Sequence, residues 1–424
     1  MSANNLLDKS KFKTQINFQE KLMKYPEYVK NCIELLETSG YSAYAVGGAV
    51  RDGLLGKEPS DWDVTTSAKP EETLEVFKDF RTIPTGIKHG TITVLFSVGE
   101  KNLPIEITTY RVDGEYLDSR HPESVEFSQD VKDDLSRRDF TVNAMAFNEK
   151  EGVIDAFGGQ NDLQNRIIRA VGDPEKRFSE DALRILRAFR FSAQLEFEIE
   201  EKTLEAAQKC SHLLKNIARE RVGVEFKKLL ASSGVAYALD LMIKNEIWQQ
   251  IFETPFPSLK DISSLKSGNF ATRLCALICN YNYNEKESIL SSLRLSNAEK
   301  KLILRLCTIK SFEIPQNSAK HSVIARHFLH LYSNIYDDAL EMLKFFFKDE
   351  QIEDFLIALN NEKCKNNPLS IADLEIKGGD ILPLCQGDFS KVGKTLEFLL
   401  EQVLDNPELN KKDKLIEIAT KELQ

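Results

Sequence analysis

The spacing of hydrophobic and polar residues changes near residue 160 of the chain. Before that point, short runs of β-forming residues over 91–96 and 104–110 alternate with turns and with an amphipathic stretch over 70–80. After it, apolar residues recur at spacings of three and four, as in the stretch 224–230. This pattern predicts an α/β first part, with strands in the two β-forming runs, followed by a part that is helical throughout.

The composition is that of a soluble globular protein of roughly two to four domains. Of the 424 residues, 42% are hydrophobic and 29% are charged, and no apolar run approaches the length that spans a bilayer. The first residues lead into polar sequence without a signal-like stretch, so we expect a cytoplasmic protein. The 7 cysteines include no Cys-x-x-Cys pair, which argues against a disulfide framework and a structural zinc site. Cys275 and Cys279, one helical turn apart, are expected to be core thiols.

A glycine pair followed by two closely spaced aspartates indicates the first candidate site. The apolar run 44–46 ends at Gly47 and Gly48, which allow the backbone to approach a phosphate closely. Asp61 and Asp63 are two residues apart, so on a strand both would project from one face and could together hold hard divalent cations. This combination suggests nucleotidyl transfer, in which two Mg²⁺ ions hold a triphosphate. The alternative is a solvated Asp-x-Asp turn after an ordinary glycine loop.

A second cluster of charged residues lies over 137–146. Two adjacent arginines and an aspartate open an apolar stretch that also contains Asn143. Guanidinium groups match phosphate oxygens, and Asp or Asn side chains can hold sugar hydroxyls, so the cluster suits a triphosphate and a ribose. The alternative is a helix N-terminus capped by Asp139 or Thr141.

A third motif places an acid and bases at helical spacing. On a helix, Asp181 and Arg184 would be neighbours at i, i+3, with Arg187 continuing along the same face. A carboxylate only accepts hydrogen bonds and a guanidinium only donates, so the pair could accept from the exocyclic amine of cytosine or adenine and donate to the base's ring acceptors. Uracil and guanine present a carbonyl at that position and would leave the aspartate unpaired. The alternative is a surface ion pair.

The net charge of −10 argues against a broadly basic coat for nucleic acid, although a local basic patch can bind RNA. Between residues 209 and 228 there are six basic side chains against two acidic ones. They are either a basic stripe for RNA or a solvated helix face.

Together these motifs resemble those of the tRNA nucleotidyltransferases, or CCA-adding enzymes, of the bacterial and eukaryotic class within the DNA polymerase beta superfamily. The matching segments follow the family's order over nearly the whole chain. They are 46–52 with Asp61 and Asp63 (metal motif), 137–145 (ribose selection), 155–163 (hinge), 180–184 (nucleotide selection), 219–228 (a helical motif) and 371–381 (C-terminal segment).

The resemblance implies an α+β fold, with a polymerase-beta-like nucleotidyltransferase head that contains a mixed sheet and an all-helical neck, body and tail. The family forms a curved molecule that grips the upper half of tRNA. The implied divisions are an N-terminal extension over 1–25, a catalytic head over 26–155, a nucleotide-selecting neck over 156–235, a body over 236–335 and a tRNA-binding tail over 336–424.

The resemblance also assigns roles to individual residues. Asp61 and Asp63 would bind Mg²⁺, and Glu106 is a candidate third carboxylate, whose alternative is a buried or edge-strand acid. The nucleotide-binding residues would be Gly47, Gly48 and Arg51 for the triphosphate, Arg138, Asp139 and Asn143 for ribose and phosphates, Asp181 and Arg184 for the base, and Arg187 and Arg190 in support.

The segment 111–122 resembles the family's flexible loop, which permits addition of the terminal A. Its proposed residues are Arg111, Asp113, Gly114, Tyr116, Asp118 and Arg120. Two positions depart from the family pattern: His121 replaces a usual arginine, and Ala156 replaces the common hinge proline, which could loosen the hinge.

We therefore expect an enzyme that adds CCA to the 3′ end of tRNA from CTP and ATP, with Mg²⁺ as cofactor. Its partners would be the acceptor end and upper half of tRNA, with no membrane and no protein partner implied. The alternatives are an enzyme that adds only A, a poly(A) polymerase, against which the CCA-type strand at 85–94 argues, and a catalytically silent RNA-binding protein.

Overall fold

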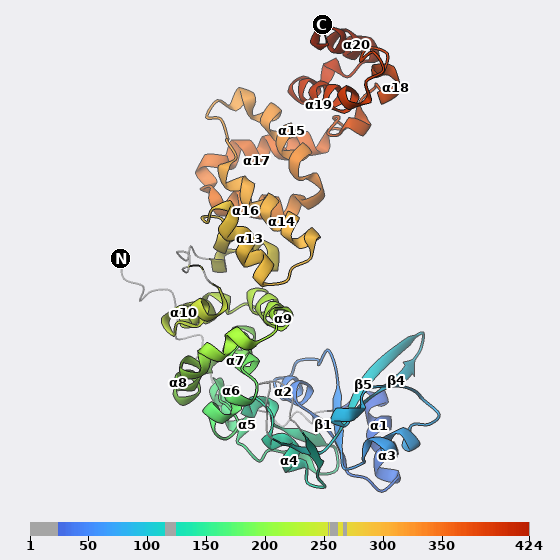
Figure 1. Ribbon diagram of the computed structural model, residues 1–424, viewed down its shortest axis with the longest axis vertical. Coiled ribbons are helices and arrows are strands. Elements are labelled where there is room, and N and C mark those ends of the chain that lie inside the picture. The colour runs from blue at the N-terminus through green and yellow to red at the C-terminus, as the bar shows by residue number, and fades with distance from the viewer. Residues whose placement is uncertain (1–23, 115–123, 253, 255–261, 266–268, 424) are drawn as a thin grey trace. The chain divides into compact units, whose positions relative to one another are not determined.

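The computed structural model describes residues 24–114, 124–252, 254, 262–265 and 269–423 (Figure 1). The chain divides into two compact units. The first holds the described residues of Met1–Ser263 and Tyr283–Leu295, and the second those of Ser264–Asn282 and Ser296–Gln424. Among the described residues, no helix is long and apolar enough to cross a membrane. The five divisions implied by the family resemblance stay a prediction.

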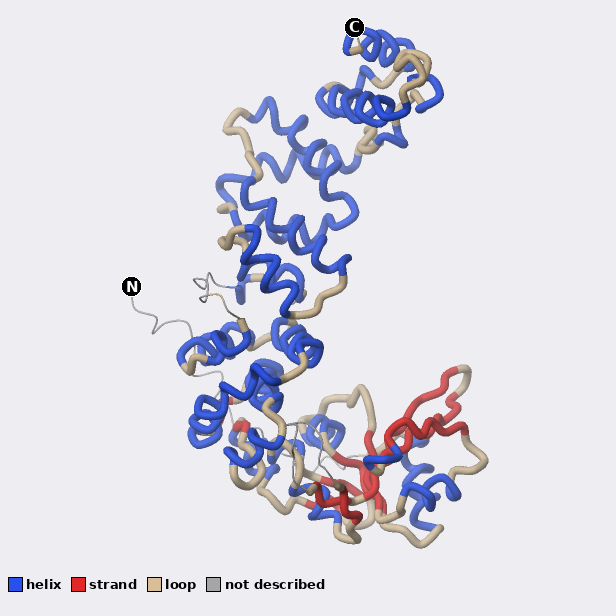
Figure 2. Tube along the Cα trace, in the orientation of Figure 1, coloured by secondary structure: helices blue, strands red, loops and turns tan. Residues whose placement is uncertain are grey.

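Within the residues described, the first unit contains a mixed sheet of seven strands in the order β3-β4-β5-β2-β1-β8-β9 (Figure 2). These strands are β1 (Ala43–Val46), β2 (Asp63–Thr66), β3 (Arg81–Gly86), β4 (Thr91–Val98), β5 (Lys101–Thr109), β8 (Ala146–Asn148) and β9 (Gly152–Ile154). β2 and β5 run parallel, whereas every other neighbouring pair in this sheet runs antiparallel. The expected mixed sheet in the first part of the chain is confirmed.

The alternation of residues explains the paired strands β4 and β5. Ile92 and Val94 of β4 are fully buried, as are Ile105 and Ile107 of β5, and the residues between them face the other side. Helix α1 (Glu27–Thr38) contacts β1, and α3 (Pro70–Val76) contacts β4 and β5. Both strands and the amphipathic helix therefore lie where the sequence predicted them.

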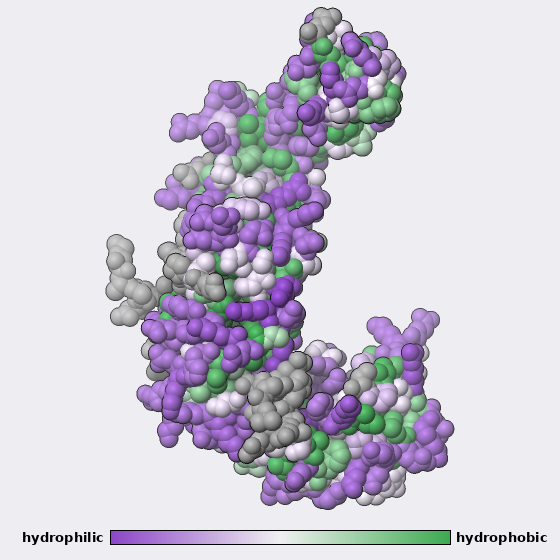
Figure 3. Space-filling model, viewed as in Figure 1, coloured by the Kyte–Doolittle hydropathy of each residue, from purple (hydrophilic) through white to green (hydrophobic). Residues whose placement is uncertain are grey.

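The other helices of the first unit that the structure describes follow the sheet strands or connect them. They are α2 (Gly48–Leu54), α4 (Val131–Ser136), α5 (Gly159–Asn165), α6 (Pro174–Glu180), α7 (Leu183–Leu195), α8 (Glu201–Cys210), α9 (Arg219–Leu230), α10 (Val235–Lys244), α11 (Ile247–Ile251) and α13 (Tyr283–Ser292). Helix α7 packs against α9 and α10. Hydrophilic side chains cover much of the visible surface of α6, α8 and α10, while the apolar faces point inward (Figure 3).

The expectation of a wholly helical remainder was wrong at one place. Two short strands, β10 (Ile167–Ile168) and β11 (Glu198–Ile199), pair in parallel. Their pairing is extended by Glu198 N–H to the Arg166 carbonyl and Glu200 N–H to the Ile168 carbonyl, each at 2.9 Å. These pairs join segments thirty residues apart, which local periodicity does not reveal.

The second unit is helical in its described residues. Its helices are α12 (Phe270–Ile278), α14 (Asn297–Thr308), α15 (His321–Tyr332), α16 (Tyr336–Phe346), α17 (Asp349–Cys364), α18 (Gly378–Ile381), α19 (Phe389–Asp405) and α20 (Lys412–Glu422). Cys275 on α12 and Cys279 directly after it are buried, as predicted for core thiols. Arg326 is buried between α15 and α17, where it donates to Glu362 at 3.1 Å and to the Leu404 carbonyl at 2.6 Å.

A close approach at Gly159 fixes the start of α5 against the segment 139–145. A Cβ at Gly159 would lie 2.3 Å from the Thr141 carbonyl oxygen, so any side chain there would overlap the backbone. The Asp155 carboxylate accepts from the Gly159 and Gln160 backbone N–H groups at 2.8 and 2.9 Å. These contacts hold a segment that also supplies the polar pocket described below.

We predict that Gly159→Ala destabilises the first unit by about 1–3 kcal/mol, because the added methyl group must displace backbone rather than a flexible side chain. Gly393→Ala is the control, since its position is exposed inside α19 with no atom within 4 Å of the added Cβ. That variant should be neutral or more stable by up to about 1 kcal/mol. Differential scanning calorimetry measures both effects, and equal stability of Gly159→Ala and the parent protein would contradict the prediction.

Candidate active site

The first unit carries a polar pocket of about 700 Å³ between the sheet and the helices α7 and α9. It brings together these residues predicted from the sequence: Gly47, Gly48, Arg51, Asp61, Asp63, Arg138, Asp139, Asn143, Arg187 and Arg190. Segments that lie far apart in the sequence, from Gly47 to Arg190, therefore meet in one hollow. Its described lining also contains residues that were not predicted: Ala49, Asp52, Ser60, Phe191, Gln194, Lys228, Ala231 and Ser232.

The two aspartates of the first motif face the pocket. Trp62 between them is buried, while Asp61 and Asp63 are exposed, which is the alternation expected of an extended chain. Only Asp63 belongs to β2, so the prediction that both lie on a strand was wrong for Asp61, which precedes the strand. The Ser60 hydroxyl donates to Asp61 Oδ1 at 2.8 Å.

Glu106 lies on the strand next to Asp63. The two residues are partners in the parallel pairing of β2 and β5, so their side chains leave the same face of the sheet. Although the Asp63 side chain reaches the pocket, the protein packed around it reduces its hydration, and this loss, together with the Glu106 and Asp61 carboxylates, raises the pKa of Asp63 to about 6 against the lowering effect of Arg138. The three acids thus repel one another.

Asp61 and Asp63 fit a hard divalent cation, because carboxylate oxygens are its preferred ligands and a cation would relieve their repulsion. In the part of the chain that the structure describes, no group of three or more His, Cys, Asp or Glu side chains is arranged to hold a metal ion. The role of Glu106 as a third carboxylate therefore stays a prediction.

Asp139 is a buried carboxylate that joins the segment after α4 to helix α7. Its Oδ2 accepts from Arg187 Nε at 2.7 Å and Nη2 at 2.6 Å. Its Oδ1 accepts from the Phe140 N–H at 2.8 Å and from Asn143 Nδ2 at 3.2 Å. Burial by itself would raise the pKa of Asp139, but the charges of Arg187 and Arg184 and the hydrogen bonds outweigh it and lower the pKa to about 2.

Arg51 is held beneath the glycine pair. Gly47, which has a φ of 77°, turns the chain from β1 into α2, and Arg51 on that helix is buried. Arg51 Nη1 donates to Asn143 Oδ1 at 2.7 Å, and its Nε and Nη2 donate to Asp52 at 2.8 and 2.9 Å. The guanidinium is therefore fixed at the edge of the pocket.

Phe191 stands among three guanidinium groups. The centre of its ring lies 3.8 Å from the guanidinium carbon of Arg190 and 5.3 Å from those of Arg187 and Arg51. Such cation–π contacts hold guanidinium groups against an aromatic face. Glu225 on α9 accepts from Arg190 Nε at 2.5 Å and lies 3.6 Å from Arg187 Nη1. The Phe191 ring and the Glu225 carboxylate thus hold these guanidinium groups in place.

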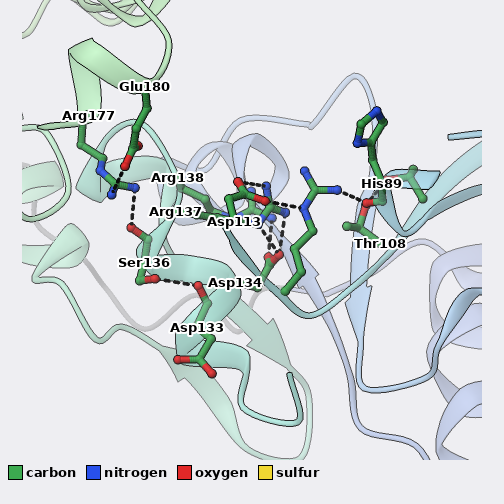
Figure 4. A network of polar contacts seen from close by, with 12 residues as sticks. His89, Thr108, Asp113, Asp133, Asp134, Ser136, Arg137, Arg138, Arg177 and Glu180 are labelled. Atoms are coloured by element: carbon green, nitrogen blue, oxygen red, sulfur yellow. Dashed lines mark hydrogen bonds and ion pairs between the residues drawn. The ribbon is translucent and has the colours of Figure 1, made fainter. Parts of the chain in front are cut away.

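Arg137 and Arg138 share the buried carboxylate of Asp134 (Figure 4). Burial would raise the pKa of Asp134, but the two arginines lower it. A Cβ at Gly47 would lie 2.9 Å from Arg138 Nη1, so glycine makes room for this guanidinium. Among the described residues, the buried Nε of Arg138 has no hydrogen-bond partner.

Asp181 and Arg184 lie outside the described lining of the pocket, and their side chains pair with other residues. The prediction that Asp181 is helical was wrong: its backbone is extended, with φ −144° and ψ 100°, between α6 and α7. Arg184 donates to the Arg137 carbonyl at 2.8 Å and to Glu180 at 3.3 Å. Asp181 accepts from Arg221 at 2.7 Å. Both nevertheless act on charges of the pocket lining, since Arg184 lowers the pKa of Asp139 and Asp181 raises the pKa of Arg187.

The proposed loop is described only at its ends. β6 (Arg111–Asp113) pairs with β7 (Val125–Phe127), and Gly114 N–H donates to the Ser124 carbonyl at 2.9 Å. Arg111 donates to Asp113 at 3.0 Å and to the His89 carbonyl (Figure 4). The predicted residues Tyr116, Asp118 and Arg120 lie outside the described residues.

Four of the six basic residues of 209–228 have contacts within the first unit, and a basic stripe for RNA stays a prediction. Lys209 pairs with Glu175 at 2.6 Å, and Arg219 donates to the Ile251 carbonyl at 2.8 Å. Arg221 holds Asp181, and Lys228 lines the pocket. Several of these cations therefore serve the interior of the first unit.

Sequence reasoning missed Phe191 and Glu225 as organisers of the pocket. Both carried a signal, because Phe191 follows arginines at every third position of α7, and Glu225 is one of two acids among the basic residues of the next helical motif. Their contacts depend on how α7 and α9 pack, which the sequence pattern does not give.

Two family models match the first unit. Residues 43–169 match the Poly A polymerase head domain, and residues 196–262 match the probable RNA and SrmB-binding site of polymerase A. Among curated relatives, the CCA-adding enzyme of Ligilactobacillus salivarius is 34% identical over 411 residues, which cover 94% of this chain and 98% of the relative. That of Lactococcus lactis subsp. lactis is 36% identical, with 91% and 96% covered.

Solved structures agree with this similarity. The CCA-adding enzyme of Bacillus stearothermophilus in complex with CTP has a TM-score of 0.75 and 29% identity, covering 94% of this chain and 98% of that one. The CCA-adding enzyme of Thermotoga maritima complexed with tRNA shares the fold, with a TM-score of 0.64, 21% identity and coverage of 95% and 97%.

We predict that Asp139→Asn lowers the stability of the first unit most at neutral pH. The pKa of the folded carboxyl, about 2, lies below the unfolded value, so its stabilising effect is complete above the unfolded pKa and is lost as pH falls toward 2. The difference from the parent protein should be on the order of 2 kcal/mol at pH 7 and smaller at pH 3. Denaturant unfolding at several pH values measures it. Glu417→Gln, at an exposed pair with Lys421, is the control, and a difference independent of pH would refute the assignment.

Proposed function

This chain belongs to the family of CCA-adding enzymes, and from that premise we propose that it adds CMP twice and AMP once to the 3′ hydroxyl of tRNA, releasing pyrophosphate at each step. The observation that supports this most is the pocket itself, where Asp61 and Asp63 face the fixed guanidinium groups of Arg138 and Arg187. Nucleotidyl transfer requires carboxylates that hold metal cations and guanidinium groups that bind phosphates.

The proposed cofactor is Mg²⁺, held by Asp61 and Asp63, and with Glu106 as a candidate further ligand. When bound, such a cation neutralises the triphosphate and makes an attacking hydroxyl more acidic. The carboxylates themselves would position the hydroxyl end of the tRNA beside the nucleotide. Because the pKa of Asp63 is raised to about 6, neutral pH keeps this acid ionised and able to bind a cation.

The arginines would orient the triphosphate. Arg187 and Arg190 are fixed by Asp139 and Glu225, so their positions do not have to be established when the nucleotide arrives. Preformed guanidinium groups lose little conformational freedom on binding phosphate oxygens. Arg138, Asp139 and Asn143, which line the same pocket, would serve the ribose and the phosphates.

The base would be chosen by Asp181 and Arg184 at the border of the site. Their complementary hydrogen-bond groups favour cytosine and adenine and oppose uracil and guanine, with no nucleic-acid template. In the structure both side chains have protein partners, so a nucleotide would have to share or replace the contacts of Arg184 with Glu180 and the Arg137 carbonyl.

The direct test supplies the protein with tRNAs that end before the first C, after one C and after both C residues, with each labelled nucleotide separately. We expect CTP incorporation into the two shorter substrates and ATP incorporation into the longest. Absence of CTP incorporation into the shortest tRNA would refute full CCA addition, and extension by ATP alone would identify an A-adding enzyme. A long run of A residues would identify a poly(A) polymerase.

We predict that Asp61→Asn lowers the rate of nucleotide addition by more than roughly 100-fold, because the variant loses an anionic ligand while keeping its shape. Asp79→Asn, an exposed acid elsewhere on the same unit, should leave the rate unchanged. Single-turnover assays measure both rates. Full activity of Asp61→Asn would show that the proposed metal ligand is wrong, even if the protein does extend tRNA.

A further inference from the structure

The carboxylate of Asp181 accepts hydrogen bonds from a backbone N–H group and from a guanidinium group. Its Oδ1 accepts from the Leu183 N–H at 3.1 Å and from Arg221 Nη1 at 3.3 Å, and its Oδ2 accepts from Arg221 Nη2 at 2.7 Å. The fork of a guanidinium on both oxygens of a carboxylate fixes the plane of the acid as well as its place. Since the Asp181 backbone is extended rather than helical, these contacts set the direction of its side chain.

Arg221 lies on helix α9, which packs closely against neighbouring segments. Glu225, one turn further along α9, accepts from Arg190 of α7 at 2.5 Å. Between them, a Cβ at Gly223 would lie 2.2 Å from the Leu293 carbonyl oxygen, so α9 packs closely on the chain that follows α13. Helix α9 thus supplies Arg221 as the partner of Asp181, which precedes α7, and Glu225 as the partner of Arg190 on α7.

The remaining acceptor capacity of Asp181 matches an exocyclic amine. A carboxylate offers about four acceptor sites, and the contacts seen among the described residues use three of them. Oδ2 has only the Arg221 contact among these, so it can also accept from the amine of cytosine or adenine. A carbonyl of uracil or guanine would face the same fixed acceptor and be repelled, whereas an acid free to rotate could turn away from it.

We infer that Arg221 is a positioning residue for the choice of nucleotide, which fixes the Asp181 carboxylate so that it accepts an amine and rejects a carbonyl. This inference rests on the proposed function, in which Asp181 reads the base. Arg221 acts through Asp181, so its removal should impair selection more than the rate of adding the correct nucleotide.

The test compares the kcat/KM of CTP with that of UTP on a tRNA lacking its terminal CCA, for the parent protein, Arg221→Gln and Arg221→Lys. We expect Arg221→Gln to lower the CTP-to-UTP ratio by roughly 10- to 100-fold, mainly by raising kcat/KM for UTP. Arg221→Lys keeps the charge but cannot form the two-pronged contact, so its ratio should be intermediate. The control is Arg294→Gln. This change removes an exposed 3.4 Å pair with Glu220, which lies on α9 like Arg221, and it should leave the ratio unchanged.

The outcomes separate the inference from the proposed function. If the parent protein adds CTP and ATP but both Arg221 variants keep its ratio, the positioning role is overturned and the proposed function stands. If the parent protein adds neither nucleotide, the proposed function fails first. If Arg221→Gln does not fold, the Arg221→Lys ratio decides, and a ratio equal to that of the parent overturns the role. Equal loss of CTP and UTP addition would also overturn it, because that is the result of a merely structural contact.

Discussion

The buried ion pair between Asp139 and Arg187 is the interaction on which the pocket depends. Taking a carboxylate out of water is costly unless a cation and hydrogen bonds replace the lost hydration. Asp139 has both, from Arg187 and Asn143. Because the acid lies in the segment between α4 and β8 and the cation lies on α7, neither element can shift without leaving a buried charge unpaired. The pair therefore fixes α7 against the segment that carries Asp139, and both of these line the pocket in which a nucleotide would be held.

The same rule governs the rest of α7. Its arginines recur at every third position, and each one faces a different acid: Arg184 faces Glu180, Arg187 faces Asp139, and Arg190 faces Glu225. Every charge is thereby held in a fixed direction, which suits a surface that must bind a triphosphate in a single pose. Asp181 repeats this arrangement with the roles exchanged, since an acid is held by Arg221.

The sequence predicted much of the fold, because its strands and helices carry clear periodicity. Strands β4 and β5 follow the alternation of their buried residues, and the residues gathered around Gly47, Asp63 and Asp139 were identified by type and spacing. Motif spacing works there because each motif is local.

What the sequence did not give depends on contacts between distant segments. The contact of Asp181 with Arg221 depends on how α7 and α9 pack, and β10 pairs with β11 across a long stretch of chain, so no local pattern encodes either one. A helical spacing rule therefore placed Asp181 and Arg184 as partners, whereas Asp181 pairs with Arg221, and Arg184 pairs with Glu180 and the Arg137 carbonyl.

A double-mutant cycle between Asp139 and Arg187 tests the dependence of the pocket on this pair most directly. The free energy of unfolding of the first unit is measured at pH 7 for the parent protein, Asp139→Asn, Arg187→Gln and the double variant. We predict a coupling energy of about 2 kcal/mol or more, because each single change leaves the other charge buried without its partner. Effects that add to within about 0.5 kcal/mol would contradict it, since additivity is the behaviour of independent sites.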